Sequence, residues 1–312
     1  MKDEPRYSAV TGALGFTGRA IAEALLARGD RVVTLTRRTP VDDPLASRLT
    51  VAPLAFDRPA DMAVALAGVD TLFNTYWIRF PRGSTTFERA VFNSAVLFAA
   101  ARRAGVRRIV HLSVVGASTE APTPYTRAKG QLEGILRSSG LEWSIVRPTL
   151  TYGPNDILVN NLAWALRRLP VYGIPGNGRY AIQPVHLDDV AALCLEAAAG
   201  RSGAVTDAAG PEMLQFRDMV GTVRRAVRSH SLVVGMPRWA VLGAARVLGR
   251  VVGDVVLTRD EILELTTGFL TSKEPPRGRI RFSDWVPANG HLLGHRWASE
   301  VARNYQVPGV EK

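Results

Sequence analysis

The chain has 312 residues, of which 46% are hydrophobic and 21% charged, a composition typical of globular proteins that excludes an intrinsically disordered chain. Its formal net charge is +11, but the basic residues are scattered in short groups, so we expect an arginine-rich soluble surface and no nucleic-acid partner. The single cysteine, Cys194, excludes an intrachain disulfide and suits a reducing compartment. The charged amino terminus lacks a signal-peptide pattern, and we expect a cytoplasmic protein.

Strand-like apolar runs alternate with helix-length segments over the first half of the chain. Strands are predicted at 8–11, 31–36, 50–56, 71–74, 108–113 and 143–146. Helices are predicted at 18–28, 59–67, 85–104 and 125–139, and a glycine follows each of them, as expected for a left-handed residue after a helix. This alternation predicts an α/β protein with a doubly wound, parallel-sheet Rossmann fold.

The regular alternation ends after Pro148, and the sequence from about residue 211 onwards is mostly helical. We therefore predict a dinucleotide-binding domain at 1–211 and a smaller, mostly helical C-terminal lobe at 212–312 for the substrate. Part of 149–180 is expected to contribute to the substrate side. Ligands of open α/β sheets bind at the carboxyl edge of the strands, so the site is expected there.

A glycine loop lies between the first predicted strand and the first predicted helix. Its glycines, spaced three apart, are Gly12, Gly15 and Gly18. In a strand–turn–helix, such glycines permit a tight turn and a close approach of the backbone to a pyrophosphate. The helix start, with Phe16 and Thr17, offers free N–H groups to the phosphates, so the loop predicts a dinucleotide cofactor.

The residues after the second predicted strand indicate which dinucleotide binds. NAD sites place an acidic residue about 20 positions beyond the glycine loop, whereas this strand is followed by Arg37 and Arg38. Arginine is well suited to bind a 2′-phosphate, and Arg19 after the last glycine adds to the positive charge. We therefore predict NADP as the cofactor, in preference to NAD.

A tyrosine and a lysine four residues apart are candidates for acid–base chemistry. Tyr125 and Lys129 share one face of a predicted helix, so the ammonium favours the phenolate and brings the tyrosine pKa towards working range. Ser113 ends a strand twelve residues earlier, at the edge where the ligand is expected. Asn74, at the end of the fourth strand, is a further candidate for cofactor binding.

With these motifs the chain resembles the short-chain dehydrogenase/reductase superfamily over at least residues 7–211, in its extended or atypical branch. The resemblance extends to Asp57, to Arg147-Pro148 and to the segment 183–190, which is similar to epimerase-like members near the complex I accessory-subunit group. It implies hydride transfer at the nicotinamide, with Tyr125 as acid or base. It also implies that Lys129 holds the ribose and that Asp57 and Pro148 contact the cofactor.

The sequence thus favours an NADP-dependent oxidoreductase that acts on a small carbonyl or alcohol. Two alternatives remain open. One is an epimerase or dehydratase with a tightly held cofactor, and the other is a non-catalytic dinucleotide-binding protein that stabilises a complex or senses the redox state. The histidines His291 and His295 have no acidic or cysteine partners, so we expect no metal site.

The segment Pro237–Leu257 is an amphipathic helix too short and too charged to span a bilayer. We expect an ordinary lobe helix, and membrane-surface contact through it is the alternative. The resemblance also implies a homodimer.

Overall fold

The computed structural model describes residues 6–38 and 43–305, and the chain forms two compact units. The first runs to Pro148 and also includes Val190–Ala208, and the second combines Thr149–Asp189 with the segment that begins at Ala209. Contacts thus group 149–189 with the C-terminal segment. The division into functional domains after residue 211 stays a prediction.

A seven-stranded parallel sheet forms the centre of the first unit, in the order β11-β6-β5-β4-β1-β2-β3. The order reverses beside β1, as in a doubly wound fold, so the predicted fold class is confirmed. The strands that match the predicted runs are β1 Tyr7–Thr11, β2 Arg31–Thr36, β3 Thr50–Pro53, β4 Thr71–Asn74, β5 Arg108–Leu112 and β6 Glu142–Pro148. The edge strand β11 Ala204–Ala208 is not among the predicted strands.

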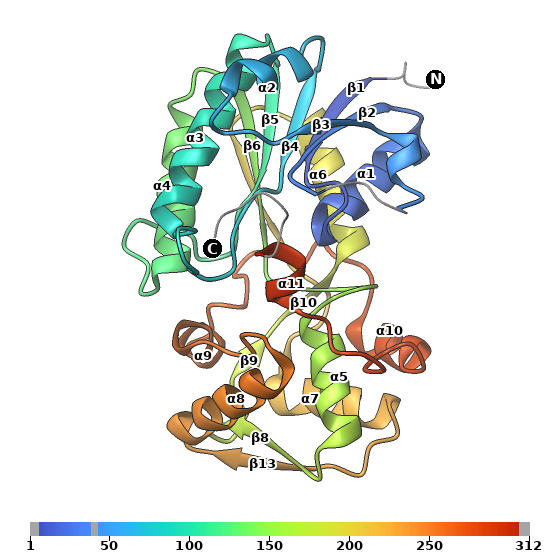
Figure 1. The fold of residues 1–312 in the computed structure, drawn as a ribbon. Coiled ribbons are helices and arrows are strands. Elements are labelled where there is room, and N and C mark those ends of the chain that lie inside the picture. Colours follow the sequence, from blue (N-terminus) through green and yellow to red (C-terminus); the bar gives the residue numbers. More distant parts are fainter. Residues whose placement is uncertain (1–5, 39–42, 306–312) are drawn as a thin grey trace. The chain divides into compact units, whose positions relative to one another are not determined.

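Helices cover both faces of this sheet, with α2, α3 and α4 on one face and α1 and α6 on the other (Figure 1). Thr86 and Thr123 cap α3 and α4, because each hydroxyl accepts a hydrogen bond from a first-turn N–H. The helical segments are α1 Phe16–Arg28, α2 Pro59–Ala65, α3 Phe87–Arg103, α4 Pro124–Arg137 and α6 Leu187–Ala199, with a 3₁₀ turn at Ala46–Arg48.

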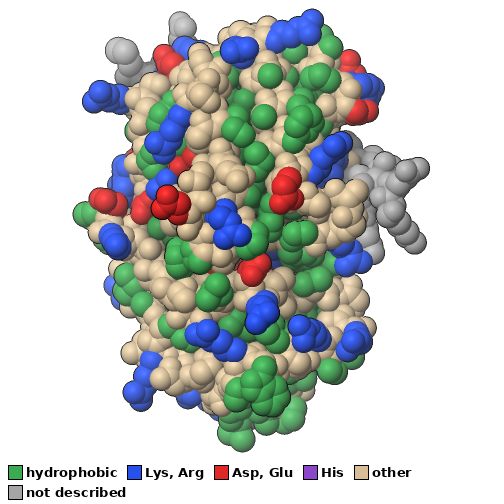
Figure 2. Space-filling model, turned by 90° about the vertical axis from the view of Figure 1, so that its left-hand side faces the viewer, with side chains coloured by type: hydrophobic (Ala, Val, Ile, Leu, Met, Phe, Trp, Pro, Cys, Tyr) green, Lys and Arg blue, Asp and Glu red, His purple; other side chains and the backbone are tan. Residues whose placement is uncertain are grey.

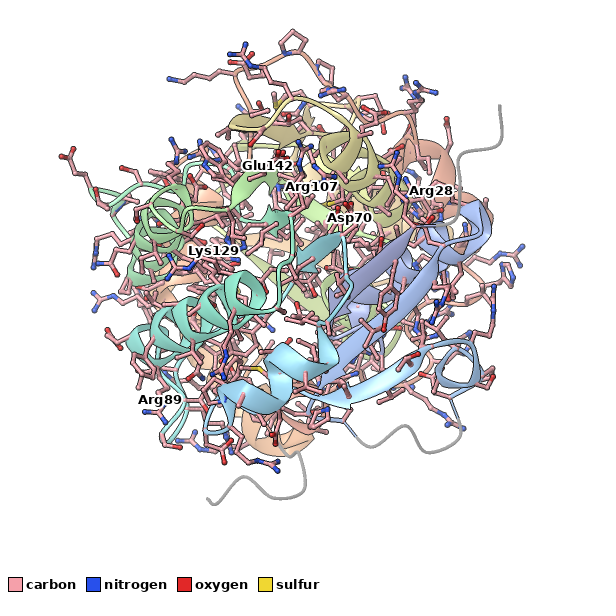
Figure 3. All side chains as sticks on the ribbon, turned by 90° about the horizontal axis from the view of Figure 1, so that it is seen from above. Arg28, Asp70, Arg89, Arg107, Lys129 and Glu142 are labelled. Carbon is pink, nitrogen blue, oxygen red and sulfur yellow. The ribbon has the colours of Figure 1, made fainter. Side chains whose placement is uncertain are left out.

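Ion pairs connect the amino ends of three strands, at the edge of the sheet opposite the expected site. Arg107 donates to Asp70 at 2.9 Å and to Glu142 at 2.7 Å, and the three side chains lie together in Figure 3. The buried Arg108 also pairs with Glu142, at 2.8 Å. The charges at this edge therefore hold strands together.

The second unit combines helices with three two-stranded sheets. Its core packs around Tyr152, whose ring meets those of Phe282 and Trp285 edge to face. The strand pairs are β7 Leu150–Tyr152 with β10 Pro184–His186, β8 Val171–Pro175 with β13 Leu232–Met236, and β9 Ala181–Ile182 with β12 Leu214–Gln215. The remaining helices are α5 Leu158–Arg168, α7 Phe216–Ala226, α8 Arg238–Val252, α9 Arg259–Thr266, α10 Phe282–Asn289 and α11 Glu300–Asn304.

The predicted amphipathic helix is α8. Val241 on its inner face is buried, while Trp239, Val247 and Val251 are exposed. In the face shown in Figure 2, basic side chains are interspersed with hydrophobic ones. Within the described ranges no helix is long and apolar enough to cross a membrane. Contact of α8 with a membrane surface stays a prediction.

Candidate functional site

The predicted glycine loop joins β1 to α1. Gly12 has a φ of +65°, a left-handed conformation that favours glycine. A Cβ atom at Gly18 would lie 2.3 Å from the Gly12 carbonyl oxygen, so only glycine lets the helix approach the loop this closely. Gly15 precedes α1 and offers no side-chain cap, which leaves the first-turn N–H groups of Phe16 and Thr17 for phosphate oxygens. The loop thus fits a dinucleotide pyrophosphate.

Arg38, one of the two arginines predicted to select NADP, lies against this loop. It donates from Nη1 to the Leu14 carbonyl oxygen at 2.7 Å, whereas Arg37 is exposed to solvent. Arg19 pairs with Asp43, which the sequence prediction did not consider. Burial alone would raise the pKa of Asp43, but hydrogen bonds from Arg19 and a backbone N–H lower it. Asp43 thus partly neutralises Arg19, and its negative charge also acts on Arg38. The contact of Arg38 with the loop itself makes it the better candidate for a 2′-phosphate.

Buried polar side chains connect the carboxyl ends of β1, β4 and β5. The Thr11 hydroxyl donates to Asn74 Oδ1 at 3.2 Å, and the Asn74 amide lies 3.2 Å from His111 Nδ1. Burial, together with the nearby charge of Lys129, lowers the pKa of His111 well below its usual value, so the imidazole is neutral and accepts at Nδ1. The Asn74 side chain thus aligns the strand before the glycine loop with the strand before Ser113.

The proposed acid–base pair lies on α4. Tyr125 and Lys129 are one turn apart, and both contact Trp77: the Tyr125 ring lies 6.1 Å from the Trp77 ring, and Lys129 Nζ lies 4.4 Å from the ring centre. Lys129 Nζ also donates to the Leu112 carbonyl oxygen at 2.8 Å. Leu112 directly precedes Ser113, so this hydrogen bond brings Lys129 close to Ser113. The structure therefore places Ser113, Tyr125 and Lys129 in one region.

Lys129 is fully enclosed, and this changes its acidity. Burial lowers the pKa of Lys129 to about 7, while the negative charge of Glu133 opposes the change. The lysine therefore changes charge near neutral pH. Perturbed acidities of this kind cluster at functional sites, although structural networks also produce them.

Ser113 is held by a carboxylate that the sequence prediction did not include. Its hydroxyl donates to Glu133 Oε1 at 2.6 Å, and Glu133 also accepts two hydrogen bonds from Arg147, at 2.8 and 2.6 Å. Glu133 is buried, and its hydrogen bond raises the pKa of Arg147. The spacing of Tyr125, Lys129 and Glu133, four residues each, places all three on one helical face and is the signal that could have revealed Glu133.

Two residues implied by the family resemblance lie outside these clusters. The Asp57 side chain is 83% exposed and lies 4.0 Å from Arg58 Nε. Pro148 ends β6, where its carbonyl oxygen accepts from the Val115 N–H at 3.0 Å. Neither is joined to Ser113, Tyr125 or Lys129 by a hydrogen bond within the described residues.

Residues 12–163 match a family model described as NAD(P)H-binding. The chain contains an NAD(P)H-binding domain. It is 26% identical over 241 residues to NADH dehydrogenase (ubiquinone) 1 alpha subcomplex subunit 9 of Arabidopsis thaliana, which covers 73% of this chain and 60% of that protein. It is 30% identical over 187 residues to a ceramide reductase of Caulobacter vibrioides, covering 59% and 58%. The chain thus spans less than two thirds of the length of either relative.

The fold of the NAD(P)H-binding domain and the segments around it also occurs in solved structures. An NADPH-dependent quinone oxidoreductase of Escherichia coli, crystallised with NADPH, matches with a TM-score of 0.73 and 20% identity over 91% of this chain and 99% of that chain. At this identity the likeness shows the fold. Together with the sequence relatives it confirms the resemblance inferred from the motifs, including the similarity to the complex I accessory-subunit group.

Proposed function

We propose that this protein is an NADP(H)-dependent oxidoreductase that transfers hydride between the nicotinamide and a carbonyl or alcohol substrate. One observation carries the proposal: the hydrogen bond of Lys129 to the carbonyl next to Ser113, with Tyr125 one turn away on the same helix. The side chains of a Tyr/Lys pair without function would be expected at the surface. Here the Lys129 ammonium is buried at the end of a central strand, where open α/β sheets bind ligands.

The glycine loop would hold the pyrophosphate, and Arg38 would bind a 2′-phosphate. Support for the first comes from the Gly12–Gly18 contact, which a side chain would abolish, and for the second from the hydrogen bond that fixes Arg38 against the loop. When bound, the nicotinamide supplies or accepts the hydride.

Tyr125 would donate a proton to the carbonyl oxygen during reduction and accept it back during oxidation. The Lys129 ammonium, one turn away, stabilises the phenolate electrostatically when it is charged. The Ser113 hydroxyl proton is engaged by Glu133, so its oxygen lone pairs would accept a hydrogen bond from the substrate alcohol or from the Tyr125 phenol. Trp77 would exclude water from the Tyr125 phenol and the Lys129 ammonium.

Net oxidation or reduction is favoured over internal epimerisation by the reductase activity of one similar protein, the ceramide reductase of Caulobacter vibrioides. The two reactions begin with the same hydride transfer but differ in cofactor balance. Stoichiometric loss of NADPH absorbance with a panel of quinones and ketones is expected for the oxidoreductase. An epimerase or dehydratase would turn over without net loss.

The decisive variant is Tyr125→Phe, which removes only the phenol oxygen. We expect loss of NADPH oxidation by at least about 100-fold, as for other general acids, with NADPH affinity retained. Tyr7→Phe is the matched control, because Tyr7 lies at the start of β1, distant from the strand ends that form the site. Full activity of Tyr125→Phe would contradict the proposal, and NADPH binding without any turnover in the wild type would favour a binding module.

A further inference from the structure

A cavity of about 490 Å³ lies in the second unit between α7 and β13. Its charged side chains are three arginines and one aspartate, and the residues that line it are Arg217, Asp218, Gly221, Arg224, Arg225, Ser231, Leu232 and Val233. The volume is in the range of small-molecule sites. None of these residues belongs to the proposed oxidoreductase site.

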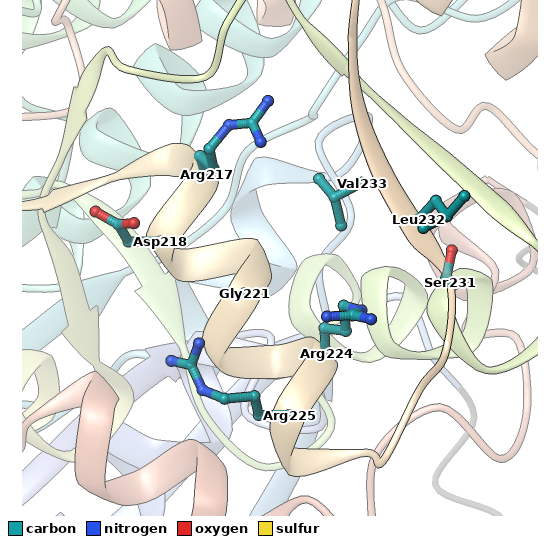
Figure 4. Close-up of a pocket in the computed structure, with 8 residues that line it drawn as sticks. All are labelled: Arg217, Asp218, Gly221, Arg224, Arg225, Ser231, Leu232 and Val233. Atoms are coloured by element: carbon teal, nitrogen blue, oxygen red, sulfur yellow. The ribbon is translucent and has the colours of Figure 1, made fainter.

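The sequence of α7 builds one wall of this cavity. Arg217, Gly221 and Arg224 are spaced four and three residues apart, so they share a helical face. A Cβ atom at Gly221 would lie 3.4 Å from Arg225 Nη1, so the glycine leaves the cavity wall open beside that guanidinium group. Figure 4 shows Arg217 and Arg224 on the side of the helix that faces β13, while Asp218 points away from it. The opposite face of the helix is buried in the core through Met219 and Val223, which fixes the helix.

Two polar atoms at this cavity are buried without a partner. They are Arg224 Nε and the Ser231 hydroxyl oxygen, which make no hydrogen bond within the described ranges of the chain. Ser231 is only 3% exposed. Buried polar groups are almost always satisfied, so such a pair calls for a bound ion, a ligand or ordered water.

The cations of this cavity are also not neutralised by the protein. Arg217 donates from Nε to the Asn177 carbonyl at 3.0 Å, and Arg225 donates to the Thr222 hydroxyl at 3.1 Å. Among the residues that the structure describes, no ion pair involves Arg217, Arg224 or Arg225. A group with more than one negative charge would compensate this excess.

From these observations we propose that the cavity binds a phosphate monoester group. Guanidinium groups and a serine hydroxyl supply the donors that phosphate oxygens require. In Figure 4 the Arg224 side chain extends from α7 toward the side of the cavity where Ser231 lies. Leu232 and Val233 form an apolar wall beside them, which suits the organic part of the ester. A soluble phosphorylated metabolite and a phospholipid headgroup present the same chemistry, and experiment distinguishes them.

The test measures binding of sn-glycerol 3-phosphate by isothermal titration calorimetry, with NADPH at saturation so that the glycine loop is occupied. We expect saturable binding by the wild type and a loss of affinity of at least about tenfold in Arg224→Gln. Gly221→Leu places a bulky side chain on the cavity wall beside the Arg225 guanidinium group without changing the charge, and it should weaken binding in the same way. Arg246→Gln, the same charge change on α8, is the control and should bind like the wild type.

A second arm uses vesicles of phosphatidylcholine with and without phosphatidic acid. Sedimentation with phosphatidic acid vesicles that is lost in Arg224→Gln and kept in Arg201→Gln, the same charge change at an exposed arginine of the first unit, would assign the site to a lipid headgroup. Binding of glycerol 3-phosphate alone, with the same sensitivity, would assign it to a soluble ester. Circular dichroism checks that the variants are folded like the wild type. If the folded Arg224→Gln and Gly221→Leu variants bind both glycerol 3-phosphate and phosphatidic acid vesicles as the wild type does, the proposal is wrong.

Discussion

The ammonium nitrogen of Lys129 lies 4.4 Å from the centre of the Trp77 ring, and the same indole meets the ring of Tyr125 edge to face. Trp77 therefore covers the proposed acid–base tyrosine and the lysine one turn away from it. By excluding water from Lys129, this packing contributes to the burial that lowers its pKa to about 7. The acidity of one lysine thus connects the stability of the protein to its proposed chemistry.

The first prediction concerns stability at alkaline pH. The pKa of Lys129 is about 7 in the folded protein and 10.5 in an unfolded chain, so between these values the unfolded state binds more protons. The free energy of unfolding should therefore rise with pH from about 7 to 10.5, by at most about 1.4 kcal/mol per pH unit from this group. Urea unfolding of Lys129→Met should lack this rise, whereas the exposed Lys273→Met should keep it. Equal pH slopes in all three proteins would contradict the assignment.

The second prediction concerns the pH dependence of turnover. If the Lys129 charge stabilises the Tyr125 phenolate, kcat/KM for NADPH-dependent reduction should fall as the pH rises through about 7, where that charge is lost. Lys129→Arg keeps a positive charge at all these pH values, so the fall should move to higher pH even if the maximal rate is lower. Coinciding profiles of the two enzymes would exclude Lys129 as the titrating group.

The third prediction concerns Glu133. Glu133→Ala removes the acceptor for Ser113 and leaves the Arg147 guanidinium without its buried partner. Breaking a buried ion pair on one side is expected to cost about 3 kcal/mol or more of unfolding free energy. Arg137→Ala removes the exposed cation of the same cluster and should cost less than about 1 kcal/mol. The midpoints of denaturant-induced unfolding measure the loss of stability in each variant. Similar losses in Glu133→Ala and Arg137→Ala would show that Glu133 is not the centre of the network.

The sequence predicts β1 to β6, because each is a short apolar run within the regular alternation of strands and helices. It does not predict β11, which lies beyond the point where that alternation ends. It also predicts that Gly12 and Gly18 lie at the turn before α1 and that Tyr125 and Lys129 share a helix, because their spacing is local. It does not reveal that Glu133 engages Ser113, or that Asp43 pairs with Arg19, because these partners are 20 and 24 residues apart and their contact depends on packing. Likewise, no sequence pattern predicts the lowered pKa of Lys129, since burial by Trp77 arises only in the folded protein.

The fourth prediction compares two glycines one turn apart on α4. A Cβ atom at Gly130 would lie 2.3 Å from the backbone carbon of Ser118, whereas one at Gly134 would meet nothing within 4 Å. Gly130→Ala should destabilise the protein by about 1–3 kcal/mol, because helix and loop must separate. Gly134→Ala should stabilise it by about 0.5–1 kcal/mol through helix propensity. Thermal melts of both variants give the comparison, and a neutral Gly130→Ala would mean that α4 is not in close contact with this loop.

The last prediction concerns cofactor choice. Arg38→Gln removes the guanidinium that lies against the Leu14 carbonyl, so a 2′-phosphate would lose a charge-assisted contact. NADPH affinity should fall by about tenfold or more, while NADH affinity stays nearly constant, because only NADPH carries that phosphate. Arg31→Gln, at the opposite end of β2, removes the same charge and should change neither affinity. Fluorescence titration of both cofactors measures the ratio. A parallel loss of NADPH and NADH binding would show that Arg38 supports the loop and does not select the cofactor.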